Sequence, residues 1–393
     1  LERIARTDVV VVSPGIPPDA PVLQALHAGG CRWVSEPEFA FRFLHGPLIA
    51  VTGTNGKTTT AAMTAHILRE SGRSVGLGGN IGAEFGPPVS GLALLEPVPE
   101  WFVVEVSSFQ LADIRDFRPD VGIVTNLAPD HLDRYPNVAS YYADKARLFD
   151  NATQECVWIL NGDSEEVSDL AGDAQGIRLR FSTQGATDSN AYLEDGILQL
   201  VGDGDEPVTV LPAEELPVLG THNAANALAA CLAAQTAGVD AQVMGEALHT
   251  FPPPPNRLEV VGETEGVRWV NDSKATNVAA TVGALRSLGG PMILLLGGKD
   301  KGEDLGTLRQ AIHPGVRAVV TFGEARGRLA GALEGLANIQ VVNGSFEEAV
   351  AAGLALAEPG DDLLLSPACS SFDMFESYVH RGRRFADLAR GGA

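Results

Sequence analysis

Thr52-Gly-Thr-Asn-Gly-Lys-Thr-Thr59 is the stretch of sequence that decides the fold prediction. The apolar segment that leads into it, Leu48–Thr52, has the composition of a buried strand. The segment that follows, residues 58–71, predicts a helix that ends at Gly72. A strand, a glycine-rich turn and a helix in this order indicate an α/β fold with a phosphate-binding loop.

The residue types in this turn suit a nucleoside triphosphate. Backbone N–H groups and the positive end of a helix attract phosphate, Lys57 can reach the terminal phosphates, and the Thr58 hydroxyl can ligate Mg²⁺. The turn departs from the strict P-loop pattern, which has glycine where this chain has Val51. A glycine-rich turn with a surface lysine is the alternative, and the flanking strand and helix favour the nucleotide site.

Strands and helices alternate along the chain, which indicates open sheets covered by helices. The proline run at residues 251–255 cannot continue a helix and predicts a domain boundary. Residues 171–217 predict small antiparallel strands at the edge of the domain before it, and residues 222–237 predict a buried helix. The first predicted strand, residues 8–13, is expected to be buried. The other predicted strands are residues 101–106, 121–125, 267–270, 292–296, 318–322 and 362–366.

Composition narrows the class of protein. A length of 393 residues favours two or three domains. The formal net charge of -22 argues against binding to nucleic acid or anionic membranes, because that binding requires Lys and Arg to neutralise phosphate. No apolar run has the length of a membrane span, and residues 1–8 show neither an initiator Met nor a signal pattern. Four cysteines without a Cys-X-X-Cys pair argue against a zinc site or disulfide framework. We therefore expect a cytoplasmic protein.

Candidate metal ligands follow the predicted strands. Glu105 ends an apolar stretch, and parallel sheets collect their sites at the carboxyl ends of strands. A carboxylate there could ligate the metal that a triphosphate requires. His131 lies in the loop after the next strand, and Lys145 lies on a predicted helix beyond it. Each residue alone would be an ordinary surface residue, so it is their combination with the phosphate loop that indicates a site.

Several short motifs follow one another along the chain. They are Gly53-Thr-Asn-Gly-Lys-Thr-Thr59, Gly79-Asn-Ile-Gly82, Glu105-Val-Ser-Ser-Phe-Gln110, Asp130-His-Leu-Asp133, Gly220-Thr-His-Asn-Ala-Ala-Asn226 and Asn256-Arg-Leu-Glu259. Together they resemble the motifs of the Mur ligase family. The resemblance covers almost the whole chain and implies an α/β fold in a three-domain architecture. Its implied parts are a remnant of an N-terminal UDP-sugar-binding domain (1–46), a central ATP-binding P-loop domain (47–252) and a Rossmann-like C-terminal domain for the incoming amino acid (253–393).

Two C-terminal motifs resemble the family members that add D-glutamate. They are Asn271-Asp-Ser-Lys-Ala-Thr-Asn277 and Ser366-Pro-Ala-Cys-Ser-Ser-Phe-Asp373. Ser13-Pro-Gly-Ile16 resembles the end of the N-terminal domain of these enzymes, so the front of that domain is expected to be absent. The resemblance implies a monomer that joins D-glutamate to UDP-N-acetylmuramoyl-L-alanine through an acyl phosphate, in peptidoglycan precursor synthesis.

The resemblance also implies ATP, two Mg²⁺ ions and a set of site residues. Lys145 matches a lysine that is carbamylated in this family, a change that turns a cation into a metal ligand. Catalytic roles would fall to Lys57, Glu105, His131 and Lys145, and metal binding to Thr58, Glu105, His131 and Lys145. ATP would be held by Gly53, Thr54, Asn55, Gly56, Lys57, Thr58, Thr59, Asn226, Arg257 and Asp272. The other substrates would be held by Ser13, Gly15, Asn80, His131, Lys274, Thr276, Lys301, Ser371, Phe372 and Tyr378.

Some alternatives stay open at this point. The stretch 297–302 departs from the family's usual order before its lysine, so Lys299 is an alternative to Lys301. A nucleotide-binding regulatory protein would keep the phosphate loop without forming a bond, and a folylpolyglutamate-synthetase-like ligase would share the loop. Glu105, His131 and Lys145 together favour an enzyme, and the C-terminal motifs argue against the folyl ligase. The stereochemistry of glutamate and the base that takes the amine proton are not decided by the sequence.

Overall fold

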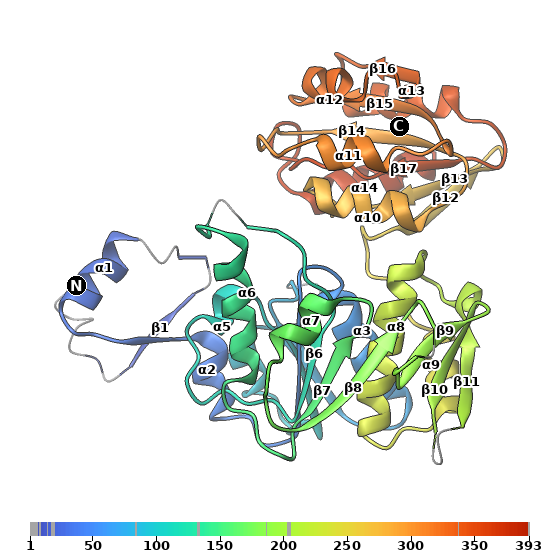
Figure 1. Cartoon of the computed structure of the whole chain (residues 1–393). Helices are drawn as coiled ribbons and strands as arrows, with labels where there is room; N and C mark the ends of the chain where they lie inside the picture. Colours follow the sequence, from blue (N-terminus) through green and yellow to red (C-terminus); the bar gives the residue numbers. More distant parts are fainter. Residues whose placement is uncertain are drawn as a thin grey trace. The chain divides into compact units, whose positions relative to one another are not determined.

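The chain folds into two compact units in the computed structural model (Figure 1). The structure describes residues 7, 9–13, 15, 16, 20–82, 85–131, 134–185, 187–202, 206–336 and 338–391. The first unit comprises Leu1–Pro217 with Asn223–Phe251, and the second comprises Val218–His222 with Pro252–Ala393. The chain passes between the units close to the proline run, where a helix cannot continue.

A nine-stranded sheet forms the centre of the first unit, in the order β11-β10-β9-β8-β7-β6-β3-β5-β4. All five residues of its strand β3 are buried, which accounts for the uninterrupted apolar sequence there. The strands are β3 (Leu48–Thr52), β4 (Val75–Gly79), β5 (Trp101–Glu105), β6 (Val121–Val124), β7 (Val157–Asn161), β8 (Ile177–Ser182), β9 (Ala191–Glu194), β10 (Ile197–Val201) and β11 (Pro207–Pro212). The helices of this unit are α1 (Pro21–Ala28), α2 (Glu36–Phe41), α3 (Lys57–Glu70), α4 (Val89–Leu92), α5 (Ser108–Leu111), α6 (Val138–Ala146), α7 (Glu165–Leu170), α8 (Thr221–Thr236) and α9 (Ala241–His249).

Two predictions for this unit need correction. Residues 171–217 do form an edge of the sheet, but β8 pairs with β7 in the parallel sense, and antiparallel pairing begins only between β9 and β10. Strand β1 (Val10–Val12) is not buried throughout, since Val11 is 42% exposed. It pairs with β2 (Trp33–Ser35) in a sheet of two strands, which is too small to cover both faces of an apolar strand.

The predicted helices of the phosphate loop and of residues 222–237 are confirmed as α3 and α8. Helix α3 packs against β3, β4 and β5, with its alanines and Met63 buried. Helix α8 is buried along most of its length, as its Ala-rich sequence predicts. The start of α3 is therefore held rigidly at the carboxyl end of β3.

A six-stranded sheet forms the second unit, in the order β12-β13-β17-β14-β15-β16. Only the pairing of β12 with β13 is antiparallel, so the carboxyl ends of β13, β17 and β14 lie side by side at one edge. The strands are β12 (Glu259–Thr264), β13 (Val267–Asn271), β14 (Met292–Gly297), β15 (Val316–Phe322), β16 (Asn338–Val341) and β17 (Asp362–Leu365). The helices are α10 (Val278–Ser287), α11 (Gly306–Ala311), α12 (Arg326–Leu333), α13 (Phe346–Leu356) and α14 (Tyr378–Ala389).

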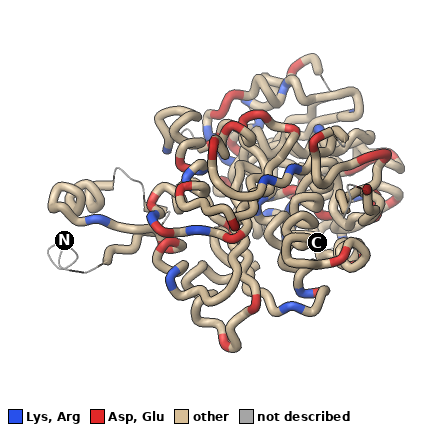
Figure 2. Tube along the Cα trace, turned by 60° about the horizontal axis from the view of Figure 1, so that its bottom comes forward, with Lys and Arg blue, Asp and Glu red and all other residues tan. Residues whose placement is uncertain are grey.

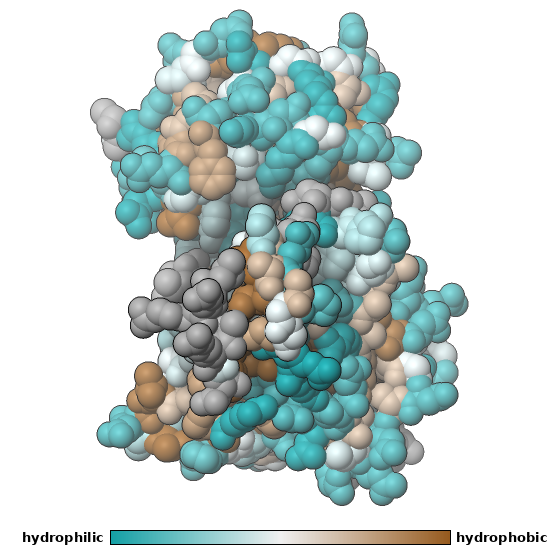
Figure 3. Space-filling model, turned by 90° about the vertical axis from the view of Figure 1, so that its left-hand side faces the viewer, coloured by the Kyte–Doolittle hydropathy of each residue, from teal (hydrophilic) through white to brown (hydrophobic). Residues whose placement is uncertain are grey.

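The distribution of charged and polar residues agrees with the composition. Acidic residues are spread along the trace drawn in Figure 2, and Lys and Arg are scattered among them. The face drawn in Figure 3 is largely hydrophilic, with hydrophobic residues in small groups. Within the described residues, no helix is both long and apolar enough to cross a membrane.

Candidate active site

The phosphate loop connects β3 to α3 and is fixed from the side by the loop after β6. The N–H groups of Thr54 and Asn55 donate to the backbone and side-chain oxygens of Asn126, both at 2.9 Å. Gly56 has a φ of 82°, and a Cβ at this position would lie 2.3 Å from Oδ1 of Asn226. Only glycine fits there. Among the described residues no side chain caps α3 at Gly56, and the positive end of a helix attracts phosphate.

Two lysine side chains converge on one carbonyl of this loop. Nζ of Lys57 donates to the oxygen of Gly53 at 3.1 Å and to that of Thr54 at 2.9 Å. Nζ of Lys145 donates to the same Gly53 oxygen at 2.7 Å. Burial, and then the neighbouring Lys57 cation, lower the pKa of Lys145 well below its ordinary value. Lys145 is therefore a buried amine biased towards its neutral, nucleophilic form.

A buried carboxylate lies beside the start of α3. Thr58 Oγ1 donates to Oε2 of Glu105 at 2.7 Å, and Nδ2 of Asn80 donates to Oε1 at 3.4 Å. These residues come from α3, from the end of β5 and from the turn after β4. Hard oxygen ligands next to a triphosphate loop fit Mg²⁺, which uses one or two carboxylates together with phosphates and water. In the described part of the chain no group of three or more His, Cys, Asp and Glu side chains could hold a metal.

His131 lies among aromatic rings next to these groups. Its backbone has a φ of 55°, and its ring meets those of Phe109 and Tyr141 edge-on, with centroids 5.0 and 5.9 Å apart. Nζ of Lys145 lies 4.7 Å from the centroid of the same Tyr141 ring, so His131 and Lys145 share a neighbour. Leu132 and Asp133 of the predicted motif lie outside the described residues.

The N-terminal motif approaches the loop of His131. Ser13 and Gly15 are exposed, and the N–H of Ile16 donates to the Ser13 oxygen at 3.0 Å, which closes a turn. Nη2 of Arg134 donates to the oxygen of Ile16 at 3.2 Å. Pro14 lies outside the described residues.

The residues predicted for the nucleoside part of ATP are divided between the two units. Asn226, in the first unit, accepts from Thr60 Oγ1 at 3.2 Å. Arg257 and Asp272 belong to the second unit, where the hydroxyl of Ser366 donates to Asp272 at 2.7 Å. Burial raises the pKa of Asp272 to about 7, although the Ser366 hydrogen bond and the charge of Arg257 act in the opposite direction.

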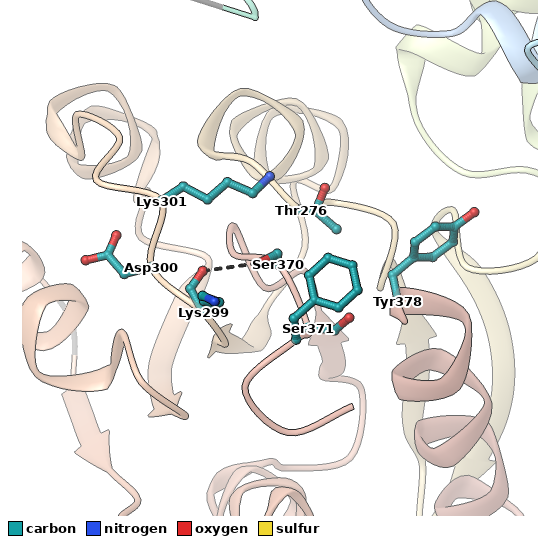
Figure 4. A pocket seen from close by; sticks show the side chains of 8 residues that line it. Thr276, Lys299, Asp300, Lys301, Ser370, Ser371 and Tyr378 are labelled. Atoms are coloured by element: carbon teal, nitrogen blue, oxygen red, sulfur yellow. Dashed lines mark hydrogen bonds between the residues drawn. The ribbon is translucent and has the colours of Figure 1, made fainter. Parts of the chain in front are cut away.

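A pocket of about 340 Å³ opens at the carboxyl ends of β13, β14 and β17 (Figure 4). In Figure 4 the side chain of Lys301 extends across it towards Thr276, while Tyr378 rises from α14 on the opposite side. The lining residues are Thr276, Lys299, Asp300, Lys301, Ser370, Ser371, Phe372 and Tyr378. Lys274 does not line it, but its Nζ bonds to Oη of Tyr378 at 2.7 Å.

The pocket collects five residues that the sequence predicts for substrate binding, together with the alternative Lys299. Sequence reasoning missed Asp300 and Ser370. The only indication in the sequence was that they neighbour predicted site residues, because Asp300 lies between Lys299 and Lys301, and Ser370 directly precedes Ser371. Asp300 is partly neutralised by Arg328, whose Nη1 lies 2.7 Å from Oδ1 of Asp300.

The distribution of lysine along the chain singles out the same places. Of the 28 basic residues, the only lysines are at positions 57, 145, 274, 299 and 301. All five lie at the phosphate loop or at the pocket, and every other cation is arginine. A lysine offers a mobile ammonium or, when neutral, a nucleophilic amine, which arginine cannot replace.

Comparison with known proteins assigns the family. Residues 51–234 match the Mur ligase middle domain and residues 256–369 the Mur ligase glutamate ligase domain. The UDP-N-acetylmuramoylalanine–D-glutamate ligase of Acidobacterium capsulatum is 41% identical over 99% of this chain and 84% of its own. The enzyme of the same name from Christiangramia forsetii is 38% identical over 99% of this chain and 86% of its own. The solved MurF ligase of Thermotoga maritima, in complex with ADP, is 17% identical, with a TM-score of 0.67 over 100% of this chain and 96% of that one. The chain therefore belongs to the Mur ligases, a family of ATP-dependent, amide-bond-forming enzymes, and within it to the UDP-N-acetylmuramoylalanine–D-glutamate ligases.

Proposed function

We propose that this protein joins D-glutamate to UDP-N-acetylmuramoyl-L-alanine with ATP, in the synthesis of peptidoglycan precursors. The observation that carries the proposal is the pocket at the ends of β13, β14 and β17. Two lysines and four hydroxyl residues line it, which is the donor chemistry that a dicarboxylic amino acid requires. Relatives that are 38% and 41% identical carry the same activity in their names.

The first step activates a poor electrophile. A carboxylate does not release oxide to an attacking amine, so one of its oxygens attacks the γ-phosphorus of ATP, and the bond to the β–γ bridging oxygen breaks. ADP leaves and an acyl phosphate forms. Lys57, released from the carbonyls of Gly53 and Thr54, stabilises the charge on the transferring phosphoryl oxygens.

Mg²⁺ would be held by Thr58 and Glu105 at the phosphate loop, and a second ion by His131 and a carbamylated Lys145. Bound there, the metal would neutralise phosphate charge and align the reacting oxygens. Lys145 fits this role because its amine is buried and its pKa lowered, so the neutral form can add CO₂ and release a proton. The resulting carboxylate would remove the repulsion that an ammonium exerts on a cation.

In the second step the amine of glutamate attacks the acyl carbon. A tetrahedral intermediate forms, loses its proton and collapses to the amide and inorganic phosphate. The hydroxyl of Ser371 and the ammonium of Lys301 hold the carboxylates of glutamate so that the amine is directed at the acyl group. Dedicated donors are needed because the chain carries a net charge of -22.

The proposal includes a division of the chain and a place of action. Residues 1–46 contribute to UDP-sugar binding, 47–252 bind ATP, and 253–393 bind the amino acid. The separate two-stranded sheet β1–β2, with its own small group of apolar contacts, supports treating the first segment apart. The protein acts as a monomer in the cytoplasm, where its nucleotide substrates are found.

Glutamate-dependent phosphate release tests the function. The purified protein is given ATP, Mg²⁺ and UDP-N-acetylmuramoyl-L-alanine, with D-glutamate, L-glutamate or no amino acid. Release that depends on D-glutamate supports the ligase. Phosphate release that no amino acid changes would instead support a nucleotide-hydrolysing regulatory protein.

A further inference from the structure

One arginine of the second unit is completely buried and hydrogen-bonds only to neutral oxygens. Arg381, on the first turn of α14, has an exposure of 0%. Across the described residues, no ion pair joins its guanidinium to a carboxylate. Burying a cation that no carboxylate contacts directly is costly, even though the charges of Asp373 and Asp272 favour it from a distance.

The guanidinium joins the loops that follow three neighbouring strands. After β13, Nε donates to Oγ of Ser273 and Nη2 to its backbone oxygen, both at 3.0 Å. At the end of β14, Nη1 donates to the oxygen of Gly297 at 3.3 Å. After β17, Nη2 donates to the oxygen of Cys369 at 3.1 Å and Nη1 to that of Ser370 at 3.5 Å. One planar fork therefore sets the spacing of all three loops.

These loops carry the pocket. Thr276 follows Ser273, Lys299 and Lys301 follow Gly297, and Ser371 follows Ser370. The loops after β14 and β17 also meet directly, because the N–H of Lys299 donates to the oxygen of Ser370 at 2.8 Å.

The backbone at Gly298 lies close to the guanidinium of Arg381. At Gly298 the φ is 132°, and a Cβ would lie 2.2 Å from the oxygen of Ser370 and 3.0 Å from Nη1 of Arg381. Only glycine leaves room for the guanidinium to reach between the loops. Helix α14 fixes the other end of the arrangement, since the hydroxyl of Ser273 donates to the backbone oxygen of Tyr378 at 2.9 Å.

We propose that Arg381 is the positioning residue of the amino-acid pocket. It touches no substrate itself, and acts by holding the loops after β13, β14 and β17 at the separation that glutamate requires. The inference rests on the proposed function for the identity of the amino acid, and on the hydrogen bonds above for the role of Arg381.

Arg381→Lys tests the proposal, because lysine keeps the charge and loses the fork. We expect the KM for glutamate to rise about 10- to 100-fold, while the KM for ATP changes by less than about twofold. Arg268→Lys is the matched control. Arg268 also forms a bidentate contact, at 2.7 and 2.8 Å to Asp362, but it lies at the opposite ends of the strands. It should lose thermal stability without a change in the KM for glutamate.

Ser273→Ala is a milder second variant that decides the question if Arg381→Lys does not fold. It removes one acceptor of the fork and should raise the KM for glutamate about 3- to 10-fold. An unchanged KM for glutamate in the variant that folds, or an equal rise in both KM values, overturns the proposal. If the unmodified protein shows no glutamate-dependent phosphate release, the proposed function fails separately.

Hydrogen exchange then decides the positioning role without any activity. Amide exchange in residues 297–301 and 369–371 should be faster in Arg381→Lys or Ser273→Ala than in the unmodified protein or Arg268→Lys. Unchanged exchange in both segments would overturn the proposal.

Discussion

Lys145→Ala is expected to lower turnover about 10²- to 10³-fold, the loss that follows when one preorganised electrostatic group is removed from a reaction centre. The structure also predicts what the substitution leaves behind. The lysine side chain is 1% exposed, with Nζ 2.7 Å from the oxygen of Gly53 and 4.7 Å from the centroid of the Tyr141 ring. Its removal creates a narrow slot that points at the phosphate loop.

Added small molecules can fill that slot, and their charge distinguishes the two chemical forms of Lys145. The atoms beyond Cβ of a carbamylated lysine match a straight-chain acid of about five carbons, so rescue should rise from formate to pentanoate. Alkylamines of the same lengths should not rescue, because they restore only the ammonium. The assay is glutamate-dependent phosphate release at fixed pH, with Lys57→Ala as the control that carboxylates should leave inactive.

The carbamate assignment is refuted if amines restore turnover and carboxylates do not. It is supported independently if removal of CO₂ and bicarbonate lowers the turnover of the unmodified protein reversibly. The lowered pKa of Lys145 favours carbamylation, because a neutral amine adds CO₂ and an ammonium does not.

Three further predictions concern single side chains. Lys57→Ala should abolish turnover at saturating ATP while leaving the thermal unfolding midpoint unchanged, since it removes a phosphate-facing charge rather than core packing; near-normal turnover would contradict the loop assignment. Ser371→Ala and Lys301→Ala should raise the KM for glutamate and spare the KM for ATP, with Lys299→Ala weaker than Lys301→Ala. A larger effect at Lys299 would assign the binding role to that residue. Burial raises the pKa of Asp272 from 3.8 to about 7, so its stabilising contribution is present below pH 3.8 and is lost as the pH rises through 7. Between pH 3.8 and about 7, the thermal unfolding midpoint of Asp272→Asn should therefore rise relative to that of the unmodified protein. A difference between the two midpoints that stays constant over this pH range would contradict the raised pKa of Asp272.

Local sequence patterns predicted much of the fold. The run of small and apolar residues around the phosphate loop predicted β3 and α3 because β3 is buried throughout and α3 is buried over most of its length. The direction of β8 was not predictable, since alternation of residues reports which faces are buried and not which strand lies next to it. The exposure of Val11 was not predicted for a similar reason, because the sequence of an apolar strand does not indicate whether a second layer covers it.

The candidate site could be predicted where its residues stand in recognisable motifs. The pocket brings together Thr276, Lys301 and Ser371, which are far apart in the sequence, because β13, β14 and β17 are neighbours in a parallel sheet. Arg381 could not be predicted, because it lies in a helix with two other arginines and only the packing of α14 distinguishes it. Contacts between loops that are distant in the sequence depend on the fold, and no local sequence pattern indicates them.

Product formation measured by mass spectrometry tests the central claim most directly. The protein is incubated with ATP, Mg²⁺ and UDP-N-acetylmuramoyl-L-alanine, with equal concentrations of D-glutamate and isotopically labelled L-glutamate in one reaction. We predict a product heavier than the acceptor by one unlabelled glutamate residue, formed together with ADP and phosphate. Incorporation of the labelled L-isomer, preference for another amino acid, or ADP formation without any amide product would contradict the assignment.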